Sequence, residues 1–387
     1  MSRCRAAIAA VLAALLAAAA PPSAVEEAPA AQGPVTTLER GLWLYLDMRE
    51  AELRASRFLV RDAALNAYVR ALLCRTVGEA RCAPLRIYIV RNAGFNASAA
   101  PNGMIELWTG LLLRTESEAE LMAVLGHELG HFEARHTLRL AREARRTSDA
   151  ALWVQAAGLP GSGYALYGLM GHLPAFSRDQ EREADRRGFE DLAAAGFRSL
   201  AAAELWERML AEADARAAAR GTPARPEARA DFLDDHPAVA ERAQSLRAAA
   251  RVRPGGGEDG RESYRRALAP WRDRLLADQI ARHDRGGSDY LIGRMAAVEG
   301  WTAPLLEARG DVYRGDAAAE HQARALRFYR AAIDTGAARP EAWRGLGLAA
   351  LRIGRTAEAA AALRAYLRQR PDAPDAALLA SLIGDAP

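Results

Sequence analysis

The five residues His127-Glu128-Leu129-Gly130-His131 constrain the fold of this chain more than any other stretch of its sequence. The two histidines are four positions apart. On an α-helix, side chains at that spacing lie about 40° apart, so both imidazoles can reach one metal ion. Because so short a motif also occurs by chance, its meaning depends on the surrounding residues and on a third ligand.

The residues around this motif predict one long helix, from Thr115 to about residue 146. Thr115 and Glu118 fit a capping box at its start. Four apolar residues recur at helical spacing, nearly opposite the histidine pair: Met122, Leu125, Leu129 and Phe132. One side of the helix is therefore expected to be buried, and the histidines are expected to face a cleft. His136 lies about 900° after His127 on such a helix, so we expect it to be a structural hydrogen-bonding residue outside the metal site.

A second group of polar residues, fifty positions after His131, can complete a metal site. Glu181 and Asp185 are four positions apart in the predicted helix 178–195, so they share one face. Glu181 can supply a carboxylate oxygen, and Asp185 can orient a ligand histidine. Two histidines and one glutamate leave the fourth zinc position for water, which is the catalytic arrangement. The alternative is a solvated helix face of acids and arginines.

The N-terminus has the three-part pattern of a secretory signal peptide. Arg3 and Arg5 precede an uncharged apolar run over Ala6–Ala20, and proline and small residues follow. The run is shorter than the roughly 20 residues that a spanning helix needs. We therefore expect residues 1–24 to be cleaved and the protein to be periplasmic. An uncleaved N-terminal anchor is the alternative.

Cysteine use and charge are consistent with an exported protein that does not bind nucleic acid. Cys74 and Cys82 favour a disulfide that closes a short loop, with two buried thiols as the alternative. The formal charge is +3 and no basic stripe is concentrated in the sequence, which argues against a nucleic-acid interface. With 387 residues, half of them hydrophobic, the chain is long enough for two or three domains.

The chain is expected to contain a mainly helical domain with a small sheet, followed by a helical repeat domain. The predicted order is a flexible tail at 25–37, a first domain at 38–250, a glycine-rich linker at 251–260 and the repeats at 261–387. Further helices are predicted at 38–59, 62–74 and 199–219, with Gly196 as a stop between the last helix and the one before it. Strands are predicted at 85–90, 95–99 and 104–109, the last two flanking the turn Pro101-Asn102-Gly103.

Residues 150–177 contain no charged side chain. Glycines and prolines interrupt this stretch before it reaches spanning length, so we expect a buried or cleft-covering pair of helices. Peripheral membrane contact is the alternative. His172, in the same stretch, is expected to be a loop residue.

The C-terminal part contains the spacing of tetratricopeptide repeats. The repeat at 340–371 is carried by Trp343, Leu346, Gly347, Ala359, Leu363 and Pro371. A looser copy precedes it, carried by Gly310, Tyr313, Ala325, Tyr329 and Ala332. Such helix pairs must stack to bury their faces, and a stack offers a concave surface to a protein partner. Ordinary antiparallel helices are the alternative.

The motifs H-E-L-G-H at 127–131 and S-R-x-x-E-x-x-A-D at 177–185 resemble the zinc metallopeptidase family of CAAX prenyl endopeptidases and HtpX heat-shock proteases. With its signal peptide and repeats, the chain is similar to the periplasmic branch of BepA-like outer-membrane assembly peptidases. The resemblance covers roughly residues 40–250 by motif and the tail by architecture. It implies a gluzincin-type α+β domain with one Zn²⁺ per chain.

The resemblance also implies roles for individual residues. His127, His131 and Glu181 would hold the zinc, and Glu128 would be the general base. The segment 99–109, which contains Pro101, Asn102, Gly103 and Met104, would form the cleft-edge strand that pairs with substrate backbone.

Asp235-His236-Pro237, followed by Arg242, resembles a Thr-His-Pro…Arg element of the same branch, with Asp235 in place of threonine. In that branch the histidine can approach the zinc and hold the enzyme latent. His236 and Arg242 are also the candidates to stabilise the transition state. A helix-capping loop with a surface histidine is the alternative.

These expectations together describe an exported zinc metalloendopeptidase that degrades misfolded or stalled envelope proteins. Its repeats would contact protein substrates or outer-membrane assembly machinery. A rival interpretation is a periplasmic chaperone or assembly factor that acts through its repeats with a latent peptidase. A repeat adaptor with a dead metal site is disfavoured, because the ligand set and Glu128 are intact.

Overall fold

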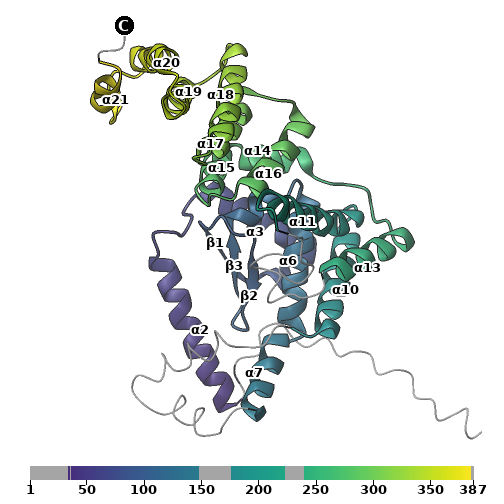
Figure 1. Ribbon diagram of the computed structural model, residues 1–387. Coiled ribbons are helices and arrows are strands. Elements are labelled where there is room, and N and C mark those ends of the chain that lie inside the picture. The colour runs from purple at the N-terminus through teal and green to yellow at the C-terminus, as the bar shows by residue number, and fades with distance from the viewer. Residues whose placement is uncertain (1–33, 35, 148–175, 223–238, 385–387) are drawn as a thin grey trace, which may run out of the picture.

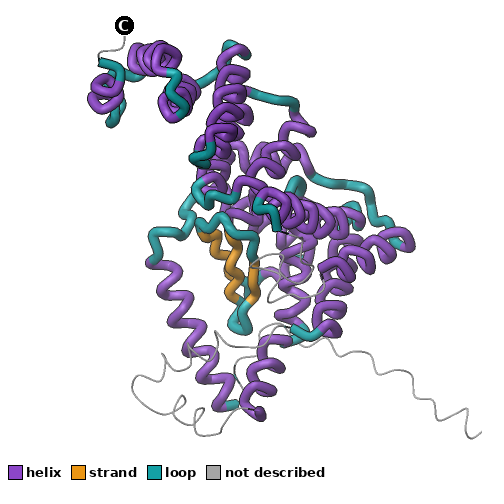
Figure 2. Tube along the Cα trace, in the orientation of Figure 1, coloured by secondary structure: helices purple, strands orange, loops and turns teal. Residues whose placement is uncertain are grey.

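The computed structural model describes residues 34, 36–147, 176–222 and 239–384. In these residues the chain is mainly helical with one small sheet, which confirms the predicted class (Figures 1 and 2). Among them, no helix is both long enough and apolar enough to cross a membrane. The expected signal peptide, His172 with most of its uncharged stretch, and His236 lie outside the described residues.

The first part of the chain contains all three strands. Its helices are α2 (Thr37–Ala55), α3 (Ala63–Val77), α4 (Glu79–Cys82), α5 (Thr109–Arg114), α6 (Glu118–Glu133), α7 (His136–Thr147), α10 (Arg178–Ala194), α11 (Leu200–Ala219) and α13 (Val239–Val252). Its strands are β1 (Arg86–Val90), β2 (Ala97–Ala99) and β3 (Met104–Trp108). The tail consists of α14 (Arg261–Leu268), η1 (Ala269–Trp271), α15 (Arg272–Ile280), α16 (Arg285–Glu299), α17 (Ala303–Arg314), α18 (Ala319–Asp334), α19 (Pro340–Arg352), α20 (Thr356–Gln369) and α21 (Ala376–Leu382).

The sheet has the order β1-β3-β2, with β1 parallel and β2 antiparallel to β3. The two strands predicted on either side of Pro101-Asn102-Gly103 are therefore confirmed, and they form a hairpin. Gly103 turns the chain between β2 and β3 with φ of 85°, and a Cβ there would lie 2.7 Å from the Pro84 carbonyl oxygen. Only glycine fits this turn without strain. β2 is an edge strand, and it contacts α6.

The single helix predicted from Thr115 is wrong at both ends. Ser117, whose hydroxyl accepts a hydrogen bond from the Glu120 N–H at 3.2 Å, caps α6, whereas Thr115 ends α5. At the other end α6 stops at Glu133, and Arg135 is left-handed with φ of 54°. One left-handed residue interrupts the helical hydrogen-bond ladder. The chain therefore changes direction, and α7 starts as a separate helix (Figure 1).

Helices α6 and α10 pack with their backbones in contact. A Cβ on Gly126 would lie 3.1 Å from the Gly188 Cα, and one on Gly130 would lie 2.9 Å from the Ala184 Cα. In the opposite direction, a Cβ on Gly188 would lie 2.7 Å from the backbone nitrogen of His127. The small residues thus let the two helices approach more closely than ordinary side chains allow. The approach places the start of α10 beside the histidines of α6.

The predicted linker 251–260 does not separate two independent cores. Tyr264 and Leu268 of α14 belong to the main core, which also contains the buried faces of α3, α6 and α11. Leu113 of α5 belongs instead to the core of α15, α16 and α17. The chain between α13 and α14 is also held in place, because the Arg198 N–H donates to the Glu258 carbonyl at 2.8 Å and the Ala119 N–H donates to the Asp259 carbonyl at 3.1 Å.

A buried ion-pair network joins the two parts. Arg114 and Glu212 have side chains that are 2% exposed, and they form a bidentate pair at 2.7 and 2.8 Å. Arg114 also donates to the Gln279 side chain at 3.0 Å, and Arg216 bridges Glu212 to Asp284. Such a network keeps its charges satisfied only while both parts stay together.

The tail contains the expected helix pairs, α17 with α18 and α19 with α20. Glycines allow these pairs to pack closely. A Cβ on Gly310 or Gly345 would lie within 2.6 Å of the Tyr329 ring, and one on Gly347 would lie 2.5 Å from Leu363. Four of the repeat-signature positions, Gly310, Tyr329, Gly347 and Leu363, are therefore packing positions in the structure.

The disulfide between Cys74 and Cys82 is present, with the two Cα atoms 5.0 Å apart. It ties the C-terminal half of α3 to α4, directly before β1. Cys82 is fully buried in the main core. The bond therefore fixes the chain where it enters the sheet.

Replacement of Gly188 by alanine tests the contact between α6 and α10. The new Cβ would collide with the backbone at His127, so we expect a loss of about 1–3 kcal/mol in the free energy of unfolding. Gly293→Ala is the matched control, because a Cβ there meets nothing within 4 Å and alanine favours a helix by up to about 1 kcal/mol. Chemical denaturation measures both. Equal stability of the two variants would contradict the close contact.

Candidate metal centre

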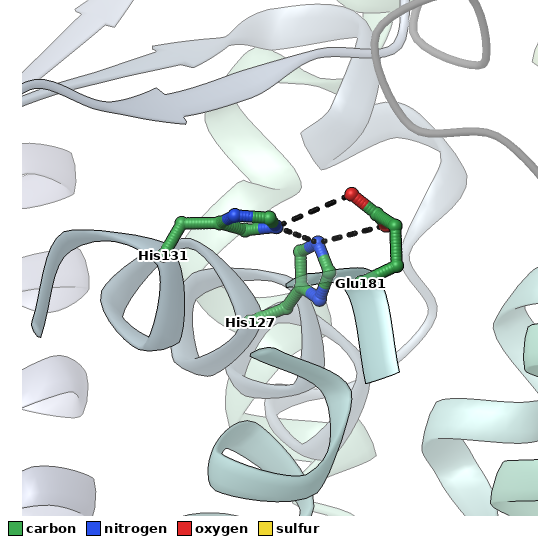
Figure 3. A group of neighbouring side chains, drawn as sticks. All are labelled: His127, His131 and Glu181. Atoms are coloured by element: carbon green, nitrogen blue, oxygen red, sulfur yellow. Dashed lines mark hydrogen bonds and ion pairs between the residues drawn. The ribbon is translucent and has the colours of Figure 1, made fainter. Parts of the chain in front are cut away.

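His127 and His131 of α6 meet Glu181 of α10 in a buried cluster (Figure 3). The two histidine Nε2 atoms are 3.1 Å apart. Glu181 places Oε1 at 3.4 Å from the His131 Nε2 atom and Oε2 at 3.6 Å from the His127 Nε2 atom. Each residue is only 1% exposed, so the histidine side of α6 is buried in the described structure rather than open to a cleft as expected.

The ligand atoms of these residues lie close enough together to share one metal ion, since one from each residue lies within 4.8 Å of the others. Zinc binds nitrogen and oxygen at about 2.0–2.2 Å, so a regular tetrahedron requires ligand atoms about 3.3–3.6 Å apart. The two imidazole Nε2 atoms are 3.1 Å apart, and each lies 3.4 or 3.6 Å from a different oxygen of Glu181, which is near that range. Three protein ligands leave one vertex of the tetrahedron for a water or a substrate oxygen.

The electrostatics also fit a divalent cation. Burial and the Arg242 guanidinium lower the pKa of His127 to about 4, against the opposing effect of Asp185 and Glu181. His127 is therefore neutral at physiological pH, as a metal ligand must be. The site contains the carboxylates of Glu128, Glu181 and Asp185 and the guanidinium of Arg242, so its formal charges sum to two negative charges, which a divalent cation would balance.

Asp185 holds the outer nitrogen of His127, as predicted. The His127 Nδ1 atom is 2.9 Å from the Asp185 Oδ1 atom, so an Nδ1–H can donate to this carboxylate and leave the Nε2 lone pair for a metal ion. Arg242 donates to the same carboxylate at 2.7 and 2.9 Å. Burial works to raise the pKa of Asp185, but Arg242 and His127 lower it below its usual value. The carboxylate therefore stays ionised.

Arg242 reaches the site from α13. Its Nη1 atom lies 3.0 Å from the Glu181 Oε2 atom, and its guanidinium lies 4.5 Å from the centre of the Trp206 ring. Burial works to lower the pKa of Arg242, but the neighbouring carboxylates, Asp185 first among them, raise it overall. The structure thus brings a permanent cation to the ligand carboxylate.

His136 holds the outer nitrogen of His131, which the sequence did not predict. The two Nδ1 atoms are 2.9 Å apart, and the His136 Nε2 atom is 3.2 Å from the Glu183 Oε2 atom. If His131 binds metal through Nε2, its Nδ1–H donates to His136, and the Nε2–H of His136 donates to Glu183. The expectation of a hydrogen-bonding His136 is confirmed, but its placement opposite His127 was wrong because the helix breaks at Arg135.

Glu128 lies between the two ligand histidines on α6 and is 2% exposed. Its carboxylate is close enough to Arg242 to contribute to the raised pKa of that guanidinium. A carboxylate at this position of the motif is within the same buried site as the ligands. The structure therefore brings together six residues singled out in the sequence: His127, Glu128, His131, Glu181, Asp185 and Arg242.

The turn after β2 is anchored by contacts with α2 and β1. Asn102 donates to the Asp47 carboxylate at 3.1 Å, and its carbonyl accepts from Arg86 at 3.1 Å, so α2 and β1 hold the turn. Met104 is buried as the first residue of β3. The edge strand β2 itself contacts α6. The role of Pro101–Met104 in substrate pairing remains a prediction.

Comparison with known proteins agrees with this site. Residues 60–250 match the family described as Peptidase family M48. The beta-barrel assembly-enhancing protease of Yersinia pestis is 32% identical over 165 residues, which cover 39% of this chain and 34% of that protein. The protein of the same name from Escherichia coli strain K12 is 31% identical over 176 residues, covering 42% of this chain and 36% of that one. Metalloprotease LoiP of the same strain is 30% identical over 168 residues, covering 42% and 60%.

The matched region contains both ligand helices and Arg242, and it starts after α2. The chain matches little more than a third of the length of the two assembly-enhancing proteases. The H-E-x-x-H helix, the third ligand at the expected distance and the family match all fall within this region. Residues 60–250 of this chain therefore match peptidase family M48 in sequence, and they contain the candidate metal ligands.

Proposed function

We propose that this protein is an exported zinc-dependent metalloendopeptidase that degrades misfolded or stalled envelope proteins. The observation that carries the proposal is the buried cluster of His127, His131 and Glu181, whose ligand atoms lie within 4.8 Å of one another, with Glu128 beside it. Zinc is the metal that best suits two neutral imidazoles and one carboxylate in this geometry.

His127, His131 and Glu181 would hold the metal. When bound, zinc supplies a Lewis acid that polarises the scissile carbonyl and lowers the pKa of water. Glu128 would accept a proton from the attacking water and pass it to the leaving amine. Arg242 holds the carboxylates of Glu181 and Asp185 and supplies a fixed positive charge near the developing oxyanion.

A substrate strand would pair with β2, whose outer edge has no neighbouring strand in the described sheet. Edge pairing supplies main-chain hydrogen bonds without demanding a particular sequence, which suits a protease of misfolded proteins. The contact of β2 with α6 places that edge next to the metal-binding helix. His236, outside the described residues, is the proposed reversible ligand that would hold the enzyme latent.

The envelope role rests on the assembly-enhancing names of two relatives and on the export signal in the sequence. The helix pairs α17–α18 and α19–α20 are proposed to be tetratricopeptide-like repeats that bind a protein partner. Outer-membrane assembly machinery and unassembled β-barrel proteins are the proposed partners.

Metal analysis of three variants tests the site. We expect about one zinc per chain in the wild type and in Glu128→Gln, because Glu128 acts on water and is not a ligand. His131→Ala should lose the metal. Glu128→Gln should lower casein cleavage by at least about 100-fold, as expected for loss of a general base. Elemental analysis measures the zinc content, and a casein cleavage assay with and without chelator measures the activity. Stoichiometric zinc in His131→Ala would refute the ligand assignment.

Replacement of His136 tests its role as a positioning residue. His136→Ala should keep the fold of α6 but weaken zinc binding by about 10–100-fold, because His131 loses the partner that fixes its ring. Competition with a chromophoric chelator measures this affinity directly, without reference to activity. His321→Ala, which removes a histidine from the tail, is the control and should leave zinc affinity unchanged. Identical affinities in both variants would show that His136 does not position the ligand.

A comparison in cells tests the biological role. In cells that lack the wild-type protein, Glu128→Gln should fail to clear stalled outer-membrane proteins, because the proposed role requires proteolysis. A variant that lacks residues 340–384 is the comparison, since it removes α19, α20 and α21. Immunoblots of an unassembled β-barrel protein provide the measurement. Full function of Glu128→Gln together with loss of function in the deletion would favour a chaperone over a protease.

A further inference from the structure

A cavity of about 410 Å³ lies where the first part of the chain meets the tail. It is lined by residues of α5, α11, α14, α15 and α16, together with the segment that links α5 to α6. The metal ligands are not among its lining residues, so it is separate from the metal centre. Its size lies in the range of about 300–1,000 Å³ that is typical of small-molecule pockets.

The inner wall of this cavity is apolar. Tyr264 and Leu268 of α14, Leu275 of α15 and Leu291 of α16 contribute buried side chains, and Met209 adds a flexible one from α11. The Tyr264 hydroxyl is already engaged with Thr115 and with the Leu112 carbonyl. The wall therefore offers an occupant apolar contacts and few hydrogen bonds.

The lining also carries more positive than negative charge. Six arginines line the cavity, against only three glutamates. Several acids that pair with these arginines, such as Glu120, Asp259 and Glu262, are not part of the lining. Glu116 alone faces three guanidinium groups, from Arg208, Arg261 and Arg294. Arg208 and Arg261 each have a second acidic partner, whereas Arg294 has only this shared Glu116 among the described residues.

Two donors at the rim lie one turn apart on α16. Arg294 binds Glu116 through Nε and Nη2, whereas its Nη1 atom makes no hydrogen bond to any other described residue. Tyr290, four positions earlier, likewise has no hydrogen-bond partner for its hydroxyl among the described residues. Met295 and Leu291 continue the same lining towards the apolar wall. One helix face thus presents polar donors beside an apolar surface.

We propose that this cavity binds a single-chain amphiphile with an anionic head, of the chemical class of long-chain carboxylates. The alkyl chain would occupy the apolar wall, and the carboxylate would accept hydrogen bonds from Arg294 and Tyr290. A charge-assisted hydrogen bond to a guanidinium is the strong type of polar contact that such a head requires.

An alkyl chain fits this cavity better than a peptide does. A bound peptide brings backbone N–H and C=O groups that need partners when they are buried. The lining comes almost entirely from helices, whose backbone groups are already paired within the helix. An alkyl chain has no polar group beyond its head, so it leaves nothing unsatisfied against this wall.

Calorimetric titration with dodecanoate, below its micelle concentration, tests the proposal on the delipidated full chain with chelator present. We expect saturable binding to one site. Arg294→Gln should weaken binding about tenfold, which corresponds to one charge-assisted hydrogen bond. Met295→Trp, at a partly buried lining position, should abolish binding by filling the cavity. Arg327→Gln makes the same charge change on an exposed face of α18 and should bind as the wild type does.

Dodecanol, which has the same chain without the charge, should bind at least about tenfold more weakly than dodecanoate. Absence of saturable dodecanoate binding would overturn the proposal. So would equal affinity for acid and alcohol, or unchanged binding in both Arg294→Gln and Met295→Trp. An acidic, apolar peptide that binds here while dodecanoate does not would assign the cavity to a protein partner instead. Because metal is removed, these outcomes do not depend on the proposed protease activity.

Discussion

Backbone contact between α6 and α10 is the constraint on which the metal centre depends. His127 and His131 belong to one helix, and any helix of this sequence would place them one turn apart. The third ligand comes from a helix that is fifty residues further along the chain. Glu181 reaches within 3.6 Å of both imidazoles because Gly126, Gly130 and Gly188 put no side chain between the helices. If α6 and α10 lay further apart, Glu181 could not share a metal ion with the two histidines.

Around this contact, three further residues stabilise the ligands without binding metal themselves. Arg242 comes from α13 and His136 from the start of α7, while Glu183 lies on the same helix as Glu181. Burial of so many polar groups is costly unless each finds a partner. Here the chain of contacts from His131 through His136 ends on a partly exposed acid, where water can solvate the remaining charge.

The ligand set could be predicted from the sequence because it depends on local spacing. His127, His131 and Glu181 each lie in a segment whose helical character is evident from periodicity, and the structure confirms both helices. The hairpin and the disulfide also follow from short-range signals, namely the Pro-Asn-Gly turn and two cysteines at close spacing. The predicted class, mainly helical with a small sheet, is confirmed for the same reason.

The break after α6 was not predictable in this way. Ala134 and Arg135 include neither glycine nor proline, and arginine rarely adopts a positive φ. Without the break, His136 stays on the wrong side of the helix and its contact with His131 is lost. The start of α6 was misplaced for a similar reason, because Thr115 and Ser117 are both plausible caps and only packing distinguishes them. Long-range packing also decides that α14 joins the first core.

The hydrogen-bonded chain between α13 and α14 has a consequence for how the tail presents a bound protein. A free glycine-rich linker would act as a tether, which raises the local concentration of a captured substrate but leaves its orientation open. Here Glu258 and Asp259 are bonded to the loop before α11 and to the first turn of α6. The start of the tail therefore has a fixed position relative to the first part of the chain. A polypeptide bound to the helices that follow would reach the metal centre at a set distance and from one direction.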